Sequence, residues 1–212
     1  DLFRLACKVS AKRLFPNFSF IDAPYNLQYY KEGNVDTEIA YMGCRTRVMG
    51  NVVDKDKEIV TGRGNLSFTS INLVRLGIKY GIVNGNKKAD LDGFFKELGD
   101  TMDMVRDQLL ERFEIQCKKK VYNFPFLLGQ GVWIDSKGLK PSDNIRRLLK
   151  HGSLTEGFIG LAECLKALTG KHHAESEESQ KLGLEIIGFM RNKCDEFAKE
   201  YNLNFTLIAT PA

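Results

Sequence analysis

The chain has 212 residues, of which 43% are hydrophobic and 27% charged, and its formal net charge is +4. This balance is typical of a globular protein with one substantial core or two small ones, and no apolar run is long enough to cross a bilayer. Basic residues are scattered among acidic ones, which argues against a nucleic-acid partner, and the five cysteines form no C-x-x-C pair, so a zinc knuckle is excluded and a reducing cytoplasm is indicated.

The first part of the chain is predicted to hold one helix followed by turns and strands. Apolar residues recur at helical spacing over residues 1–14, and Pro16 ends that helix. Residues 17–34 are rich in turn-forming residues. The next elements are expected to be a strand over Thr37–Met42, a turn over Asn51–Lys57 and a strand over Asn65–Leu73.

The second part alternates helices with strands. Its clearest helix is Asp90–Lys119, where apolar residues fall at steps of three and four. The other predicted strands are Phe124–Ile134, Ser153–Leu161 and Leu203–Ala209, and the other predicted helices are a short one capped by Ser142-Asp143, Ala162–Leu168 closed by Gly170, and Glu175–Asn202. Strands that alternate with long helices predict an α/β fold with mostly parallel strands.

The most distinctive local pattern is a cysteine loop, Tyr41–Arg47, followed by Gly62–Asn65. Gly43 lets the backbone turn and approach a ligand closely, so Cys44 would sit at the tip of a loop. Local chemistry alone favours a less specific interpretation, because free cysteines are usually small buried hydrophobes and an asparagine after glycines is usually a turn residue.

Three other patterns are interpreted as structural. Arg45 and Arg47 are expected to brace the cysteine loop rather than bind phosphate. His172 and His173 are adjacent and lack an evident third ligand, which argues against a metal site. Gly129–Gly131 lacks the lysine and the spacing of a phosphate-binding P-loop.

Eight motifs taken together resemble the anaerobic (class III) ribonucleotide reductase large subunit, a glycyl-radical enzyme. They are Phe15–Phe20, Met42–Val48, Thr61–Thr69, Gln108–Phe113, Leu128–Trp133, Gly157–Glu163, Leu168–His173 and Ala209–Ala212. Each is weak alone, but they follow one another in order from about residue 10 to the end. The resemblance implies that residues 1–212 are a single segment, truncated at both ends, of a ten-stranded α/β barrel with long amphipathic helices outside.

The resemblance also implies a reaction and the residues that perform it. The reaction is thiyl-radical reduction of ribonucleoside triphosphates to deoxyribonucleoside triphosphates for DNA synthesis, with formate as reductant. The implied sites are a thiyl on Cys44, a substrate and formate pocket at Asn65, Met42 and Thr46, and a phosphate loop at Thr210, Pro211 and Ala212. These residue types suit the roles, because an amide both donates and accepts hydrogen bonds and a proline in a first helical turn leaves neighbouring N–H groups free for an anion.

Several implied components lie outside the chain. They are a glycyl radical made by an iron–sulfur/S-adenosylmethionine activase, a structural zinc, formate as co-substrate, dNTP and ATP effectors, and a homodimeric partner. The 212 residues hold no arginine-valine-cysteine-glycine-tyrosine run of the glycyl-radical type, so the isolated segment is expected to be inactive. The alternatives are another glycyl-radical enzyme related to formate lyases, and a non-catalytic scaffold. Neither a membrane nor a nucleic acid is expected as a partner.

Overall fold

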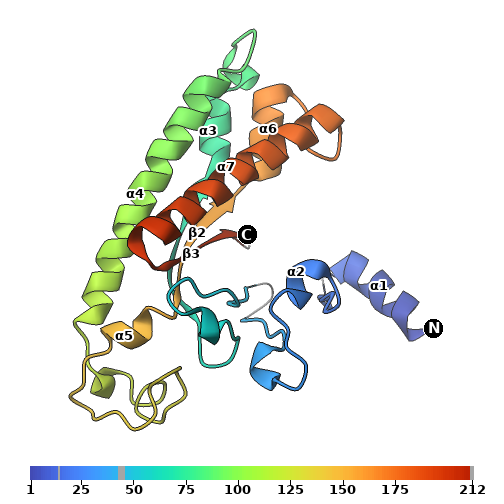
Figure 1. Cartoon of the computed structure of the whole chain (residues 1–212). Helices are drawn as coiled ribbons and strands as arrows, with labels where there is room; N and C mark the ends of the chain where they lie inside the picture. The colour runs from blue at the N-terminus through green and yellow to red at the C-terminus, as the bar shows by residue number, and fades with distance from the viewer. Residues whose placement is uncertain (14, 43–45, 211–212) are drawn as a thin grey trace.

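The structure of the protein is a computed structural model that describes residues 1–13, 15–42 and 46–210. Its centre is a three-stranded parallel sheet in the order β1-β2-β3. The strands are β1 (Asn65–Asn72), β2 (Ser153–Ile159) and β3 (Asn204–Ala209). The two longest helices, α4 (Leu91–Cys117) and α7 (Glu177–Tyr201), run along one side of this sheet (Figure 1).

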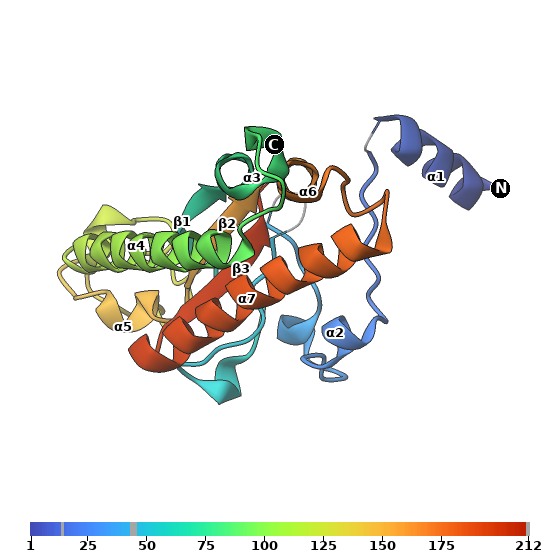
Figure 2. The same cartoon turned by 90° about the horizontal axis from the view of Figure 1, so that it is seen from above.

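Shorter elements surround the sheet. The helices are α1 (Leu2–Arg13), α2 (Pro24–Leu27), α3 (Leu73–Tyr80), α5 (Arg146–Leu149) and α6 (Leu161–Thr169), and the 3-10 turns are η1 (Val35–Thr37), η2 (Lys55–Lys57), η3 (Ile82–Asn84) and η4 (Val121–Asn123). Helix α1 projects away from the other elements (Figure 2), and none of its residues is buried. No helix within the described residues is long and apolar enough to cross a membrane.

The hydrophobic core lies between the sheet and the helices α3, α4, α6 and α7. Helix α4 contributes an apolar stripe that includes Phe94, Leu98, Met102 and Leu109, all fully buried. These residues recur at steps of three and four, so one side of the helix faces the sheet along its length. The apolar residues that predict this helix are therefore the ones that pack it against the sheet.

The two faces of the sheet differ in chemistry. Leu154 and Phe205 point into the helix layer, on what we call the helix face. Thr155 and Thr206 are register partners on the neighbouring strands β2 and β3, and both line a cavity on the opposite side, which we call the cavity face. Side chains alternate between the two faces along a strand, so successive residues of one strand face the core and the cavity alternately.

Strand β1 contains a β-bulge at its start. Asn65 pairs with Ser153 and Ser67 pairs with Leu154, so β1 has one more residue than β2 at this point. The extra residue is Leu66, which packs against the core. As a result Asn65 lies on the cavity face, although Ser67 and the alternate residues after it lie on the helix face.

Most predicted elements are confirmed, including the parallel α/β arrangement. The strand predicted over Thr37–Met42 is wrong, since this stretch holds part of η1 and a single bridge from Met42 to Thr46. Thr37 explains the difference, because its hydroxyl accepts a hydrogen bond from the Lys31 N–H at 2.9 Å and donates one to the Asn34 carbonyl at 2.7 Å. These bonds close a turn instead of extending a strand.

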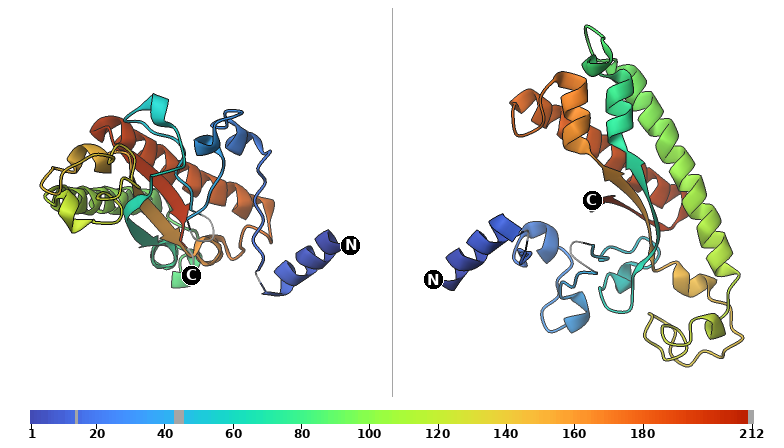
Figure 3. Two further views of the ribbon diagram at one scale, coloured as in Figure 1. Left: turned by 90° about the horizontal axis from the view of Figure 1, so that it is seen from below. Right: turned by 180° about the vertical axis from the view of Figure 1, so that it is seen from behind.

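Two further predictions in the 118–145 segment are also wrong. Phe124–Ile134 forms consecutive turns, such as the hydrogen bond from Leu128 N to Phe124 O at 3.0 Å, and Figure 3 shows irregular loops here beyond the end of α4. Asp143 does not cap α5, since its carboxylate accepts from Lys140 N at 2.9 Å.

Helix α3 was not predicted, and its signal is Asn72, whose side chain accepts from Arg75 N at 3.2 Å as an N-cap.

Candidate functional site

Four of the predicted site residues line one cavity of about 720 Å³ beside β1. They are Met42, Thr46, Asn65 and Thr210, and the other lining residues are Leu66, Ser67, Phe68, Arg112 and Ile208. The lining comes from segments up to 168 positions apart in sequence, from Met42 to Thr210. The fold therefore brings together residues that the sequence keeps apart.

The cysteine loop is closed at its base by a backbone bridge. Met42 N donates a hydrogen bond to Thr46 O at 2.7 Å, and both residues line the cavity. Cys44, predicted as the thiyl residue, lies between them but outside the described residues, as does Arg45. The flanking pair shows that the base of this loop adjoins the cavity.

The amide of Asn65 is held at both ends. Its Nδ2 donates to Thr155 Oγ1 at 2.9 Å, and its Oδ1 accepts from the backbone N–H of Ser67 at 3.1 Å. An amide has two N–H donors and a carbonyl oxygen with two lone pairs. Among the residues that the structure describes, the second N–H and the second lone pair of Asn65 have no partner, and both can serve a ligand in the cavity.

Thr210 lies at the end of β3, and its hydroxyl is paired with another hydroxyl. Thr210 Oγ1 and Ser70 Oγ are 2.6 Å apart, and Thr210 N donates to Phe158 O at 2.9 Å. Gly157 lies beneath this pair on β2. Pro211 and Ala212, predicted with Thr210 as a phosphate loop, lie outside the described residues.

Gly157→Ala is expected to disrupt the Ser70–Thr210 pair. A Cβ at this position would overlap Thr210 Oγ1 and come within 2.7 Å of Ser70 Oγ. Because Gly157 is paired with β1 on one side and β3 on the other, the strands cannot move apart freely. We therefore expect a loss of about 1–3 kcal/mol in the free energy of unfolding, measured by thermal unfolding. Gly188→Ala is the matched control, since a Cβ there meets nothing within 4 Å in α7. Equal unfolding temperatures for the two variants would contradict the prediction.

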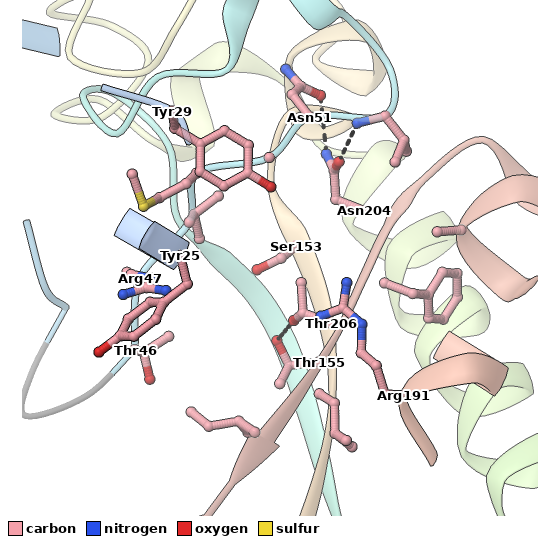
Figure 4. A pocket seen from close by; sticks show the side chains of 18 of the residues that line it. Tyr25, Tyr29, Thr46, Arg47, Asn51, Ser153, Thr155, Arg191, Asn204 and Thr206 are labelled. Atoms are coloured by element: carbon pink, nitrogen blue, oxygen red, sulfur yellow. Dashed lines mark hydrogen bonds between the residues drawn. The ribbon is translucent and has the colours of Figure 1, made fainter. Parts of the chain in front are cut away.

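A second cavity of about 940 Å³ lies on the cavity face of β2 and β3. Thr46 and Ile208 line both cavities, so the two adjoin. Figure 4 shows its polar wall, which includes Ser153, Thr155, Asn204, Thr206 and Arg191. The sequence interpretation did not identify this wall, although buried Ser, Thr and Asn residues in apolar strands are a signal for it.

Arg47 has the bracing role predicted for it. Its guanidinium donates to the Asn26 side-chain oxygen and lies 5.0 Å from the ring centroid of Tyr25. These contacts tie the segment after the cysteine loop to α2.

Arg63 is the main residue that the sequence interpretation missed. Only 8% of it is exposed, and it lies between two glycines just before Asn65. Its guanidinium donates to four backbone carbonyl oxygens, those of His151 (2.8 Å), Met49 (2.8 Å), Ile59 (3.0 Å) and Gly50 (2.8 Å). Burial lowers the pKa of Arg63 to about 10, so it remains a cation at neutral pH.

A buried polar junction adjoins Arg63 at the base of β2 and β3. Asn51 Nδ2 lies 3.0 Å from His151 Nδ1, and Asn204 Nδ2 donates to Asn51 Oδ1 at 3.3 Å. Burial lowers the pKa of His151, which favours a neutral ring whose Nδ1 accepts from Asn51. The segment that follows the cysteine loop is thereby fixed to both strands.

The described residues contain no group of three or more histidine, cysteine or acidic side chains that could hold a metal ion. His172 belongs to a turn, where its Nδ1 accepts from Ala174 N at 3.1 Å. Cys117, Cys164 and Cys194 are buried, and burial raises the pKa of Cys164 to about 12. These three are thus core residues rather than reactive thiols.

The family of the chain follows from comparison with known proteins. The family model described as anaerobic ribonucleoside-triphosphate reductase matches residues 1–212. The chain belongs to this family. Reductases of that name from Salmonella typhimurium, Escherichia coli and phage T4 are 27%, 26% and 27% identical to the whole chain. The chain spans 28%, 28% and 32% of their lengths, so it corresponds to a part of the reductase polypeptide.

Solved reductase structures share the fold. An anaerobic ribonucleotide reductase matches 69% of the chain with a TM-score of 0.52 and 16% identity, over 20% of its own length. The enzyme from Thermotoga maritima, solved with glycerol in its active site, matches 77% of the chain with a TM-score of 0.52 and 14% identity, over 23% of its length. The parallel sheet and its helices therefore have the fold of part of the reductase barrel.

Proposed function

We propose that the chain forms the central catalytic segment of an anaerobic ribonucleoside-triphosphate reductase. The observation that carries this proposal is the shared cavity, in which Asn65 and Thr210 meet the two residues that flank the cysteine loop, Met42 and Thr46. The family match supplies the reaction class, reduction of a ribonucleotide to a deoxyribonucleotide. It also argues against a relative of the formate lyases.

The reaction assigns a distinct task to each part of this cavity. Cys44, as a thiyl, takes the hydrogen atom from the 3′ carbon, and the 2′ hydroxyl leaves as water. Formate supplies two electrons and the hydrogen that refills the 2′ position and is released as carbon dioxide, one proton taken up from solvent completes the water, and Cys44 returns the 3′ hydrogen. The free N–H and lone pair of Asn65 suit a sugar hydroxyl and the formate carboxylate, with Met42 and Thr46 beside them. Thr210, with Pro211 and Ala212, would meet the phosphates.

The remaining components belong to the rest of the polypeptide and its partners. A glycyl radical, made by an iron–sulfur/S-adenosylmethionine activase, would supply the oxidising equivalent. A structural zinc, dNTP and ATP effectors and a homodimer complete the proposed enzyme, which we place in the cytoplasm. The isolated segment is expected to be an inactive scaffold, because its 212 residues hold no glycyl-radical motif.

Cys44→Ser in the full-length protein is expected to abolish turnover, about 1,000-fold or more, as for removal of other catalytic nucleophiles. A serine O–H bond is too strong to exchange its hydrogen as a thiol does. The measurement is deoxyribonucleotide formation under anaerobic conditions after activation. Cys7→Ser is the matched control, because Cys7 lies on α1 and lines neither cavity, and it should keep full turnover. Retained turnover in Cys44→Ser would make the proposal wrong.

A further inference from the structure

A row of hydrogen bonds crosses the cavity face of the sheet from the Asn65 amide. Asn65 Nδ2 donates to Thr155 Oγ1 at 2.9 Å, and Thr155 Oγ1 lies 2.8 Å from Thr206 Oγ1. Figure 4 shows the two threonine hydroxyls meeting between neighbouring strands. One side chain from each of β1, β2 and β3 thus takes part.

Thr155 is an unusual residue for its position. It lies in the central strand of a parallel sheet and is only 2% exposed. Such strands are normally rich in valine, isoleucine and leucine. Valine has almost the shape of threonine, so packing alone does not require the hydroxyl.

The hydroxyl of Thr155 has a specific consequence for Asn65. Thr155 Oγ1 can accept from the amide nitrogen at one end, while the Ser67 N–H donates to the amide oxygen at the other. Exchanging the two ends of the amide would place two donors at Ser67, so only one orientation satisfies both contacts. Thr206 limits the rotation of the Thr155 hydroxyl in turn.

We propose that Thr155, supported by Thr206, is a positioning residue that fixes the Asn65 amide in a single orientation toward the substrate cavity. The inference rests on the proposed function, since it takes Asn65 as the residue that contacts substrate. Thr155 acts through Asn65. Loss of the hydroxyl should therefore impair the chemical step and leave the fold intact.

The test uses turnover and nucleotide KM of the full-length protein. Thr155→Val is expected to lower kcat about 10-fold with KM unchanged, because a misplaced contact group can cost up to about 100-fold. Thr155→Ser restores the hydroxyl and should return kcat to within about threefold of wild type. Thr101→Val is the matched control, because this half-buried threonine donates only to the Glu97 carbonyl within α4, at 2.7 Å. It should keep full kcat.

Three results would overturn the inference. They are full kcat in Thr155→Val, full kcat in Asn65→Ala, and failure of Thr155→Ser to restore activity. If Thr155→Val unfolds early, Thr206→Val tests the same row of hydrogen bonds from the partly buried residue on β3. Its kcat is expected to fall about threefold. An unchanged kcat in Thr206→Val would then contradict the inference. Retained turnover in Cys44→Ser would instead refute the proposed function, so the two failures are distinguishable.

Discussion

Glu156→Met should stabilise the protein, and the gain should increase with pH. Glu156 lies on the helix face of β2 and is 0% exposed, and neither carboxylate oxygen has a hydrogen-bond partner within the described structure. Burial raises the pKa of Glu156 to about 8. Lys193 is the cation that lowers this pKa most, but it does not compensate, because its Nζ lies 3.0 Å from both carboxylate oxygens of Asp103.

The direction of the pH effect follows from the raised pKa. Below pH 4.5, the ordinary value, the carboxyl is protonated in both states and adds no charge penalty. Between 4.5 and about 8 the unfolded chain releases the proton while the folded chain keeps it. The free energy of unfolding then falls by about 1.4 kcal/mol per pH unit. The ionisable group costs several kcal/mol at pH 8, and Met removes that cost while filling a similar volume.

The measurement is thermal unfolding of the full-length protein from pH 5 to pH 8.5. Glu156→Gln is the matched control, because it keeps a buried polar group and removes only the titration. The glutamine variant should lose the pH dependence and gain less stability than the methionine variant. A stability difference that does not change with pH would show that Glu156 has a charged partner, and would contradict the prediction.

Arg63→Met should destabilise the protein by about 3–5 kcal/mol, since each buried carbonyl left unpaired costs about 1–3 kcal/mol. The guanidinium bonds four carbonyls at once, and no other side chain has its planar set of five donors. Arg63→Lys should recover less than half of the loss, because an ammonium presents its donors from one point. Thermal unfolding measures both effects.

The control for Arg63 is another arginine with apolar neighbours. Arg106 pairs with Asp103 and Asp107 and lies 5.0 Å from the Phe197 ring centroid, at the partly exposed seam of α4 and α7. Arg106→Met should cost about 1 kcal/mol or less. Hydrogen exchange should also accelerate over residues 46–65 in Arg63→Met and stay unchanged in α7. Equal destabilisation by the two variants would show that Arg63 is an ordinary structural arginine.

The two long helices, α4 and α7, could be predicted from the sequence because their signals are local. The apolar stripe of α4 and the Ser176 cap of α7, which accepts from Ser179 N at 3.1 Å, lie within a few residues of the features they specify. Glu156 could not be predicted as buried. A charge in a strand normally indicates an exposed edge, and its burial depends on α4 and α7 covering β2.

The candidate site also contains some residues that the sequence predicts and others that it does not. Asn65 and Met42 follow from the family resemblance, and the structure places both at one cavity. Arg63 and Thr155 were missed because their partners are distant, with 88 positions between Arg63 and His151 and 90 between Thr155 and Asn65. No local pattern marks a residue whose role is set by such partners.

The β-bulge at Leu66 makes the direction of the Asn65 side chain depend on the number of residues in β1 and not only on their identity. Strict alternation would turn Asn65 toward α4 with Ser67, and the one additional residue turns it toward Thr155 on the cavity face. Relatives that lacked this residue could keep every side chain of the motif and still present the amide to the wrong side of the sheet. An insertion or deletion at this point therefore changes the direction of the Asn65 side chain more than most substitutions in β1 would.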